Sequence, residues 1–102
     1  MKKLTSIQAK YLRGLAHALK PVVFVGQKGV TPPLIKSTDE AFRSHELIKV
    51  KFIDNKEKDQ KKEIAAALEN KTDCRMAGMI GHIAIFYRPH SEPDKRKIIL
   101  PE

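Results

Sequence analysis

A short apolar run of β-branched residues at residues 22–25 predicts a buried strand, and three further short segments have the pattern of strands. The first three of these strands each follow a longer stretch with helical spacing, and the fourth comes directly after the third. This order constrains the fold most, because strands separated by helices pair in one sheet that the helices then cover. The expected strands span residues 22–25, 47–53, 75–80 and 82–88, and the expected helices span residues 6–19, 32–45 and 57–71. We therefore expect an α/β fold, a compact sandwich around a four-stranded mixed sheet in the order α-β-α-β-α-β-β.

Local signals define the ends of the first two expected helices. Thr5 and Gln8 form a capping box at the start of the first helix, and Pro21 ends it. Thr31 caps the second helix, with Pro32 at its first position. The side chains expected to face the core are Leu4, Ile7, Tyr11, Leu15 and Ala18 in the first helix, Leu34, Ile35, Thr38, Ala41 and Phe42 in the second, Ile64, Ala65 and Leu68 in the third, and Ile48, Val50 and Phe52 in the second strand.

The length of 102 residues suits a single domain. We expect one domain over residues 1–89 and a C-terminal tail over residues 90–102, in which residues 97–100 form a short edge strand or stay loose. We also expect a turn at residues 54–55 and a hairpin around Gly81.

The chain carries no pattern of a membrane or secreted protein. No apolar stretch approaches the ~20 residues that span a bilayer, and the N-terminal lysines are not followed by a signal-peptide core. The single cysteine, Cys74, forms neither an internal disulfide nor a multi-thiolate zinc site. We expect a cytoplasmic location and no membrane partner.

Positive charge is concentrated in the first third of the chain. Residues 1–38 contain seven basic and no acidic residues, whereas residues 39–102 contain thirteen basic and twelve acidic residues. Seven of the eight net positive charges therefore lie in the first segment. A surface selected only for solubility mixes both signs. The one-sided surplus is typical of a protein that binds a polyanion, with RNA, DNA or an anionic membrane as candidates.

The first candidate binding feature is a basic stripe on the first expected helix. Its members, spaced three, four and three residues apart on one helix face, are Lys10, Arg13, His17 and Lys20. Any helix has a polar outer face, but such a face usually mixes Glu with Lys, and this one has no acidic residue. We therefore predict that the stripe contacts the polyanion.

The second candidate feature is the loop formed by Gly26, Gln27, Lys28 and Gly29, which joins the first strand to the second helix. Glycines let the backbone approach a phosphate closely, and amide N–H groups at the start of the helix can face the anion. The loop resembles the GxxG loop with which KH domains hold the nucleic-acid backbone. Glycines at this spacing are also common in plain turns, so the prediction depends on the basic helix as well.

Further candidates are Lys49 and Lys51 on one strand face and Arg88 after the last strand. The alternative for the two lysines is a solvated edge strand, where Lys also deters aggregation. Most of the six aromatic residues fall on expected core positions, so we expect recognition of backbone and shape rather than base stacking.

Catalytic patterns are weak. The four histidines lack the spacing of metal ligands, and the glycine loop lacks the Gly-Lys-Ser/Thr ending of a P-loop. A pair of Cys74 and His82 across the hairpin is the one catalytic arrangement left open, and a buried cysteine is usually a small apolar residue. We expect no enzymatic activity, no metal, no cofactor and no small-molecule substrate.

Several segments resemble a known family. The runs LRGLAHALKPVV (residues 12–23) and VGQKGVT (residues 25–31) resemble the CRM domain, named for chloroplast RNA splicing and ribosome maturation. HELIKVK (residues 45–51) and the segment at residues 80–89 extend the resemblance over about residues 4–89. Because one domain fills the chain, it is similar to the stand-alone bacterial members, the YhbY family. The resemblance implies an α/β fold similar to the C-terminal domain of translation initiation factor three.

The resemblance also implies RNA binding and association with large-subunit ribosome precursors. It carries the RNA contacts onto residues 26–29, onto Arg13, His17 and Lys20, and more loosely onto Lys49 and Lys51. The chain departs from the family at His82, where a cationic residue is expected, and in its pair of prolines at residues 32–33.

Our leading hypothesis is a non-catalytic RNA-binding factor of ribosome assembly. Its glycine loop and the start of the second helix would hold phosphates, and the basic first helix, expected to lie adjacent to the loop, would supply further positive charge. Ribosomal RNA in large-subunit precursors is the expected partner. The alternative is a protein-interaction adaptor that docks on ribosomal proteins or on an RNA-processing enzyme.

Overall fold

A computed structural model describes residues 1–54 and 57–102 of the chain. The elements are α1 (Ser6–Ala16), β1 (Val23–Val25), α2 (Pro32–Ser44), β2 (Leu47–Phe52), α3 (Lys58–Thr72), β3 (Arg75–Ile80), β4 (Ile83–Tyr87) and a 3-10 helix η1 (Pro93–Lys95). This order confirms the expected α/β fold with its four-stranded sheet. The turn expected at residues 54–55 reaches residue 55, which lies outside the described residues.

The sheet has the strand order β1-β2-β4-β3 and is mixed. β1 runs parallel to β2, because α2 carries the chain back across the sheet, and the other two pairs are antiparallel. Gly81 turns the hairpin between β3 and β4 with a φ of 59°. The register shifts between Met76 and Gly78, so Ala77 forms a bulge in the edge strand β3.

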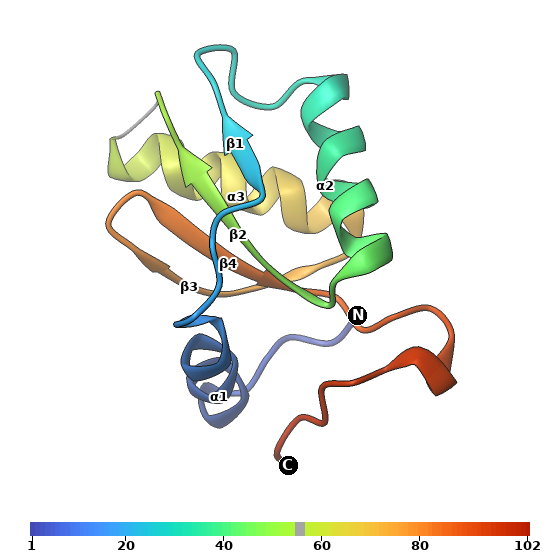
Figure 1. Cartoon of the computed structure of the whole chain (residues 1–102). Coiled ribbons are helices and arrows are strands. Elements are labelled where there is room, and N and C mark those ends of the chain that lie inside the picture. The colour runs from blue at the N-terminus through green and yellow to red at the C-terminus, as the bar shows by residue number, and fades with distance from the viewer. Residues whose placement is uncertain (55–56) are drawn as a thin grey trace.

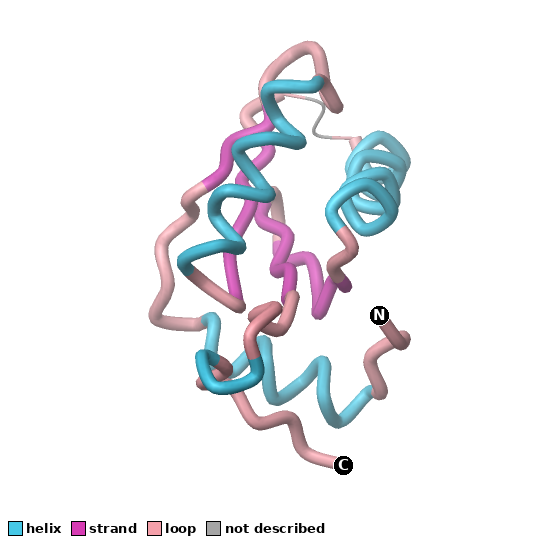
Figure 2. Tube along the Cα trace, turned by 90° about the vertical axis from the view of Figure 1, so that its right-hand side faces the viewer, coloured by secondary structure: helices cyan, strands magenta, loops and turns pink. Residues whose placement is uncertain are grey.

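α2 and α3 cover one face of the sheet and α1 covers part of the other, which gives three layers (Figures 1 and 2). The larger core lies beneath α2 and α3, and most of the side chains expected to face it do so. Those buried as expected are Leu34, Thr38, Phe42, Ile48, Val50, Phe52, Ile64, Ala65 and Leu68. Thr31 caps α2 and Thr5 caps α1 through the expected capping box with Gln8.

The buried face of α1 differs from the prediction. Ile7, Tyr11 and Leu15 are exposed, whereas Leu12 and Ala16 are fully buried against the sheet. α1 also ends at Ala16, before the expected end at residue 19. The chain has to turn there to place β1 beside β2. The ammonium of Lys49 stabilises this end by donating to the carbonyl oxygen of Leu19 at 2.9 Å.

The C-terminal tail forms no strand among residues 97–100, but it is held to the domain. The buried carboxylate of Glu46 accepts hydrogen bonds from the backbone N–H groups of His90, Lys97 and Ile98 at 3.0, 2.7 and 3.0 Å. Ile98 and Leu100 then pack against the cluster beneath α1. The tail therefore completes the smaller core.

Within the described part of the chain, no helix combines the length and the apolar character needed to cross a membrane.

Candidate functional site

The loop of residues 26–29, here called the glycine loop, lies at one end of the molecule between β1 and α2 (Figure 1). The backbone N–H of Gly29 donates to the carbonyl oxygen of Gly26 at 3.1 Å, and Gly29 has a φ of 65°. This left-handed conformation is readily available to glycine. Lys28 is exposed at the tip of the turn. A groove of about 520 Å³ runs beside the loop and is also lined by Phe24, Thr31 and Ser37.

The start of α2 does not supply the hydrogen-bond donors that we expected there. Pro32 and Pro33 occupy the first two helical positions and have no N–H group. The third N–H, from Leu34, already donates to the side-chain oxygen of Thr31 at 3.2 Å. The prediction that the helix start holds a phosphate is therefore wrong in its mechanism, because the prolines and the cap leave that turn without free donors.

The loop offers donors of its own. Among the described residues, the backbone N–H groups of Lys28, Val30 and Thr31 donate to no other protein group. Backbone N–H groups without a protein partner, in a turn that includes a left-handed residue, are suited to donate to an anion. The positive charge of Lys28 lies at the same place. The glycine loop is therefore suited to hold a phosphate through its own backbone and one lysine.

The basic residues of α1 do not form one surface with the glycine loop. α1 and the loop lie at opposite ends of a molecule that is 37 Å long (Figures 1 and 2). Lys10 and His17 are exposed at the α1 end, and Lys20 is exposed in the connection that leads from α1 to β1. The expectation of a basic helix adjacent to the loop is therefore wrong, since α1 packs mainly on β3, the strand farthest from β1.

Arg13 is turned inward, away from the predicted stripe. Its Nη1 atom donates to the carbonyl oxygen of Ala77, in the bulge of β3, at 2.8 Å. Its aliphatic stem lies over Gly78. Helical spacing alone suggested that Arg13 shares the outer face with Lys10, but the sheet accommodates an arginine where β3 lacks a side chain. Arg13 therefore has a structural role in the smaller core.

The predicted strand residues Lys49 and Lys51 differ in their surroundings. The ammonium of Lys49 is engaged at the end of α1, where it also lies 3.5 Å from the carbonyl oxygen of His17. Lys51 is exposed and pairs in register with Phe24 of β1 on one side and with Ile83 of β4 on the other. Of the two lysines, Lys51 has the freer side chain for an external partner.

A row of side chains crosses the half of the sheet face that α1 leaves open. In strand order the row consists of Phe24, Lys51, Ile83 and Ile80. Phe24 is 55% exposed and Ile80 is 65% exposed, although we expected the first strand to be buried. We call these four residues the open row. The sequence carries no clear signal for the exposure of Phe24, because all three residues of β1 are apolar and only the structure places Val23 and Val25 on the buried face.

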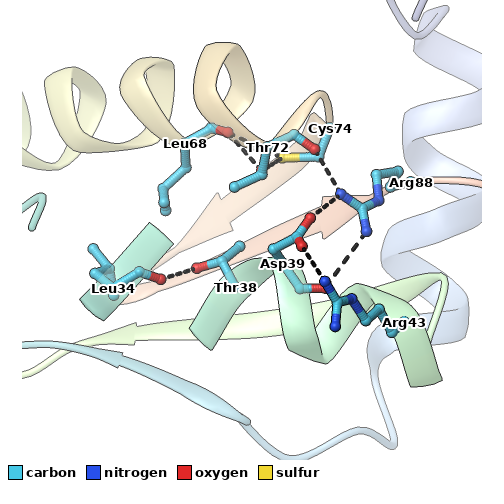
Figure 3. A network of polar contacts seen from close by, with 8 residues as sticks. All are labelled: Leu34, Thr38, Asp39, Arg43, Leu68, Thr72, Cys74 and Arg88. Atoms are coloured by element: carbon cyan, nitrogen blue, oxygen red, sulfur yellow. Dashed lines mark hydrogen bonds and ion pairs between the residues drawn. The ribbon is translucent and has the colours of Figure 1, made fainter. Parts of the chain in front are cut away.

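Arg88 belongs to an internal network rather than to an open surface (Figure 3). Its Nη1 atom donates to Asp39 Oδ1 at 2.8 Å and to the carbonyl oxygen of Thr72 at 2.9 Å. Its guanidinium also lies 4.8 Å from the centre of the Phe42 ring. The hydrogen bond from Arg88 is the main cause that holds the pKa of Asp39 below its ordinary value. Arg88 therefore joins α2, α3 and β4.

Cys74 and His82 are not neighbours. Cys74 precedes the first residue of β3, and His82 lies in the turn after its last residue, so the full length of the hairpin separates them. Cys74 is buried, and burial raises the pKa of its thiol to about 11. His82 instead contacts the ammonium of Lys61 at 3.3 Å. The pairing left open by the sequence is absent. The described residues also contain no group of three or more potential metal ligands.

Comparison with known proteins places these features in a family context. The family model of the CRS1/YhbY (CRM) domain matches residues 4–88. A Haemophilus influenzae protein named "RNA-binding protein" is 39% identical over 101 residues, which cover 99% of this chain and 98% of that protein. The Bacillus subtilis protein named "Probable RNA-binding protein YqeI" is 37% identical and covers 96% and 99% of the two chains.

A solved structure agrees with the fold. The solution structure of the hypothetical protein SAV1595 from Staphylococcus aureus matches this chain with a TM-score of 0.81 at 35% identity. The match covers 96% of this chain and 99% of that one. The similarity therefore extends over whole chains rather than over a shared fragment.

Proposed function

Because the chain belongs to the CRS1/YhbY (CRM) domain family, we propose that it binds RNA by holding the phosphate backbone at the glycine loop. Its relatives in Haemophilus influenzae and Bacillus subtilis carry RNA-binding names, which supports this choice among the polyanions. The observation that carries the proposal is the glycine loop itself, with a left-handed Gly29, an exposed Lys28 and three backbone N–H groups that donate to no other described residue.

The loop binds phosphate without help from the first turn of α2. The N–H groups of Lys28, Val30 and Thr31 donate to phosphate oxygens, and the Lys28 ammonium adds a charge-assisted contact. These contacts position the RNA backbone and carry no sequence information.

Long-range attraction comes from the distribution of charge. Three exposed cations lie on α1, in the connection to β1 and beside β1, namely Lys10, Lys20 and Lys51. The first two belong to residues 1–38, which contain no acidic residue. Neutralising phosphates with these side chains releases counterions, so binding weakens as salt rises. RNA can thus run along the β1 side of the molecule from the α1 end towards the glycine loop.

We further propose that the protein acts without catalysis in ribosome biogenesis, in the cytoplasm, with ribosomal RNA of large-subunit precursors as its partner. The membership of the family supports this finer assignment. Sedimentation of a cell lysate at low magnesium, with and without ribonuclease, tests it. We expect the protein to travel with free large-subunit particles or their precursors and to return to the top of the gradient after ribonuclease. A protein that stays at the top in both gradients contradicts the ribosomal role.

A protein-docking adaptor is the second candidate, and one observation favours it. Ile7, Tyr11 and Leu15 form an exposed apolar stripe on the outer side of α1. The same gradients separate the two functions. An adaptor that docks on protein stays with its partner after ribonuclease treatment, whereas a protein that is held by RNA does not.

A further inference from the structure

We propose that the open row binds the unpaired bases of a single-stranded RNA, with the ring of Phe24 as the stacking surface. This inference rests on the proposed function, and it names the class of RNA that the site takes. The row consists of Phe24, Lys51, Ile83 and Ile80, which lie side by side across β1, β2, β4 and β3.

The exposure of Phe24 has no internal explanation in the fold. Its neighbours in β1, Val23 and Val25, are 3% and 0% exposed because they face α2 and α3. Phe24 faces the opposite side, where α1 packs mainly on β3 and leaves the β1 end of the sheet uncovered. A phenylalanine that is 55% exposed adds little to the core. An aromatic side chain on an open sheet face is a platform on which bases stack.

The position of Phe24 links it to the phosphate site. One residue, Val25, separates Phe24 from the glycine loop, so the Phe24 ring lies on the open sheet face at the loop end of β1. A base is joined to its phosphate through a single sugar, so a phosphate held at the loop brings a base to this end of the sheet face. The amide donors and Lys28 thus fix the backbone, and the Phe24 ring receives the base.

The chemistry of the row favours RNA over another occupant. Lys51 lies directly beside Phe24 in the register and is exposed, so a cation accompanies the aromatic ring. Ile83 and Ile80 continue the row with apolar surface and no acidic residue. An aromatic ring beside a cation and apolar side chains complements a strand with stacked bases and a negative backbone.

The row selects unpaired RNA. The bases of an A-form duplex are stacked on one another inside the helix, so a side chain on a sheet face has no access to their planes. Duplex RNA still reaches the glycine loop with its phosphates. Phe24 therefore contributes to the binding of single strands and not to the binding of duplexes.

A tryptophan placed at this position provides a direct test, because the chain has no tryptophan of its own. In Phe24→Trp, we expect a short oligoadenylate to quench the fluorescence of the indole, and an A·U duplex of the same length to leave it unchanged. Ile99→Trp is the matched control, since Ile99 is 84% exposed in the C-terminal tail, away from the row. Its fluorescence should respond to neither RNA.

Affinity measurements complete the test. Phe24→Ala should weaken oligoadenylate binding by about tenfold, as expected for one lost stacking contact, and leave duplex binding unchanged. Phe24→Tyr should keep the affinity of the wild type, because the ring remains. Circular dichroism checks that the variants stay folded, which we expect since Phe24 makes no part of either buried cluster.

The outcomes separate this inference from the proposed function. If wild-type protein binds both RNAs but the Phe24→Trp signal is not quenched and Phe24→Ala binds normally, the open row does not hold bases, and the glycine-loop function stands. If the wild type binds no RNA, both fail. If the Phe24→Trp signal changes with protein concentration in the absence of RNA, a second copy of the chain covers the row, and the inference is overturned.

Discussion

The side chain of Arg13 in α1 lies directly over Gly78 in β3, so close that a Cβ atom on that glycine would stand 2.5 Å from Arg13 Cδ. The arginine thus occupies the space of the missing side chain, and its Nη1 atom reaches the carbonyl oxygen of Ala77 in the bulge. Ala77 lies at the point where the bulge interrupts the strand ladder, and Arg13 supplies its carbonyl oxygen with a charged donor. This contact determines which face of α1 meets the sheet.

Replacing Arg13 should therefore affect stability and spare RNA binding. Arg13→Ala should lower the free energy of unfolding by about 1–3 kcal/mol, because the Ala77 carbonyl loses its charged donor. RNA affinity should change by no more than about threefold, the effect of one distant charge. Urea unfolding and RNA titration measure the two quantities.

A double-mutant cycle isolates the contact itself. Gly78→Ala should destabilise the wild type and cost less in the Arg13→Ala background, with a coupling of about 1 kcal/mol. Equal costs in the two backgrounds would show that Arg13 and Gly78 do not interact. A large loss of RNA affinity in Arg13→Ala would show that Arg13 contacts RNA and would contradict its purely structural role.

Glu46 should make the stability of the tail depend on pH. Burial opposes its ionisation, but the three backbone donors outweigh burial and hold the pKa of this carboxyl below its ordinary value of 4.5. A carboxyl whose pKa is lower in the folded state stabilises that state above its ordinary pKa. The contribution is lost as the pH falls from about 4.5 through the folded-state pKa.

The variant Glu46→Gln tests this dependence. At neutral pH it should be about 1–3 kcal/mol less stable, because the amide NH₂ group faces N–H donors. The difference from the wild type should shrink as the pH falls below 4.5, which urea unfolding at several pH values measures. Trypsin should also cut sooner after Lys95 and Arg96 in the variant. A difference that stays constant with pH would exclude the ionised carboxylate as the cause.

Arg88 should behave as a structural residue, contrary to its place among the predicted RNA contacts. Arg88→Met keeps an apolar stem over Phe42 but leaves the Thr72 carbonyl without its donor, so we expect a loss of about 1–3 kcal/mol. The control is Asp39→Asn, which should cost less because the carboxylate is 40% exposed and its ion pair is screened by water. RNA affinity should be unchanged in both, as filter binding can establish.

The thiol of Cys74 should be inert in the folded protein. It is buried, and burial raises its pKa to about 11, so little thiolate forms near neutral pH. Alkylation by iodoacetamide should proceed only as fast as the protein opens, and urea should accelerate it strongly. Rapid alkylation of the native protein would reopen a nucleophilic role for this residue.

Short-range patterns predicted much of the fold. Capping at Thr5 and Thr31 and the alternation of Ile48, Val50 and Phe52 depend on neighbours in the sequence, and all are confirmed. The orientation of α1 could not be predicted in the same way. Its sequence offers two apolar sides about 100° apart, one with Tyr11 and one with Leu12, and a distant glycine in β3 decides between them.

The candidate site was predicted only where it depends on local sequence. The turn of the glycine loop follows from the residues of the loop itself. Whether α1 lies beside the loop depends on where α1 packs, which the local sequence does not show. The lack of free donors at the start of α2 follows only when Pro32, Pro33 and the Thr31 cap are considered together. Phe24 was missed because a strand of three residues is too short to display its alternation clearly.

The most direct test of the central claim is the salt dependence of RNA binding in three proteins: the wild type, Lys28→Glu and Lys62→Glu. The two variants change the net charge equally, but exposed Lys62 lies on α3, on the other side of the sheet from the open row. If four to six phosphates are contacted, log affinity for the wild type should fall against log salt with a slope of about −3 to −5.

Lys28→Glu should weaken binding at least about tenfold and flatten the slope, while Lys62→Glu should stay close to the wild type. Equal losses in the two variants, or a wild-type slope near zero, would contradict phosphate binding at the glycine loop.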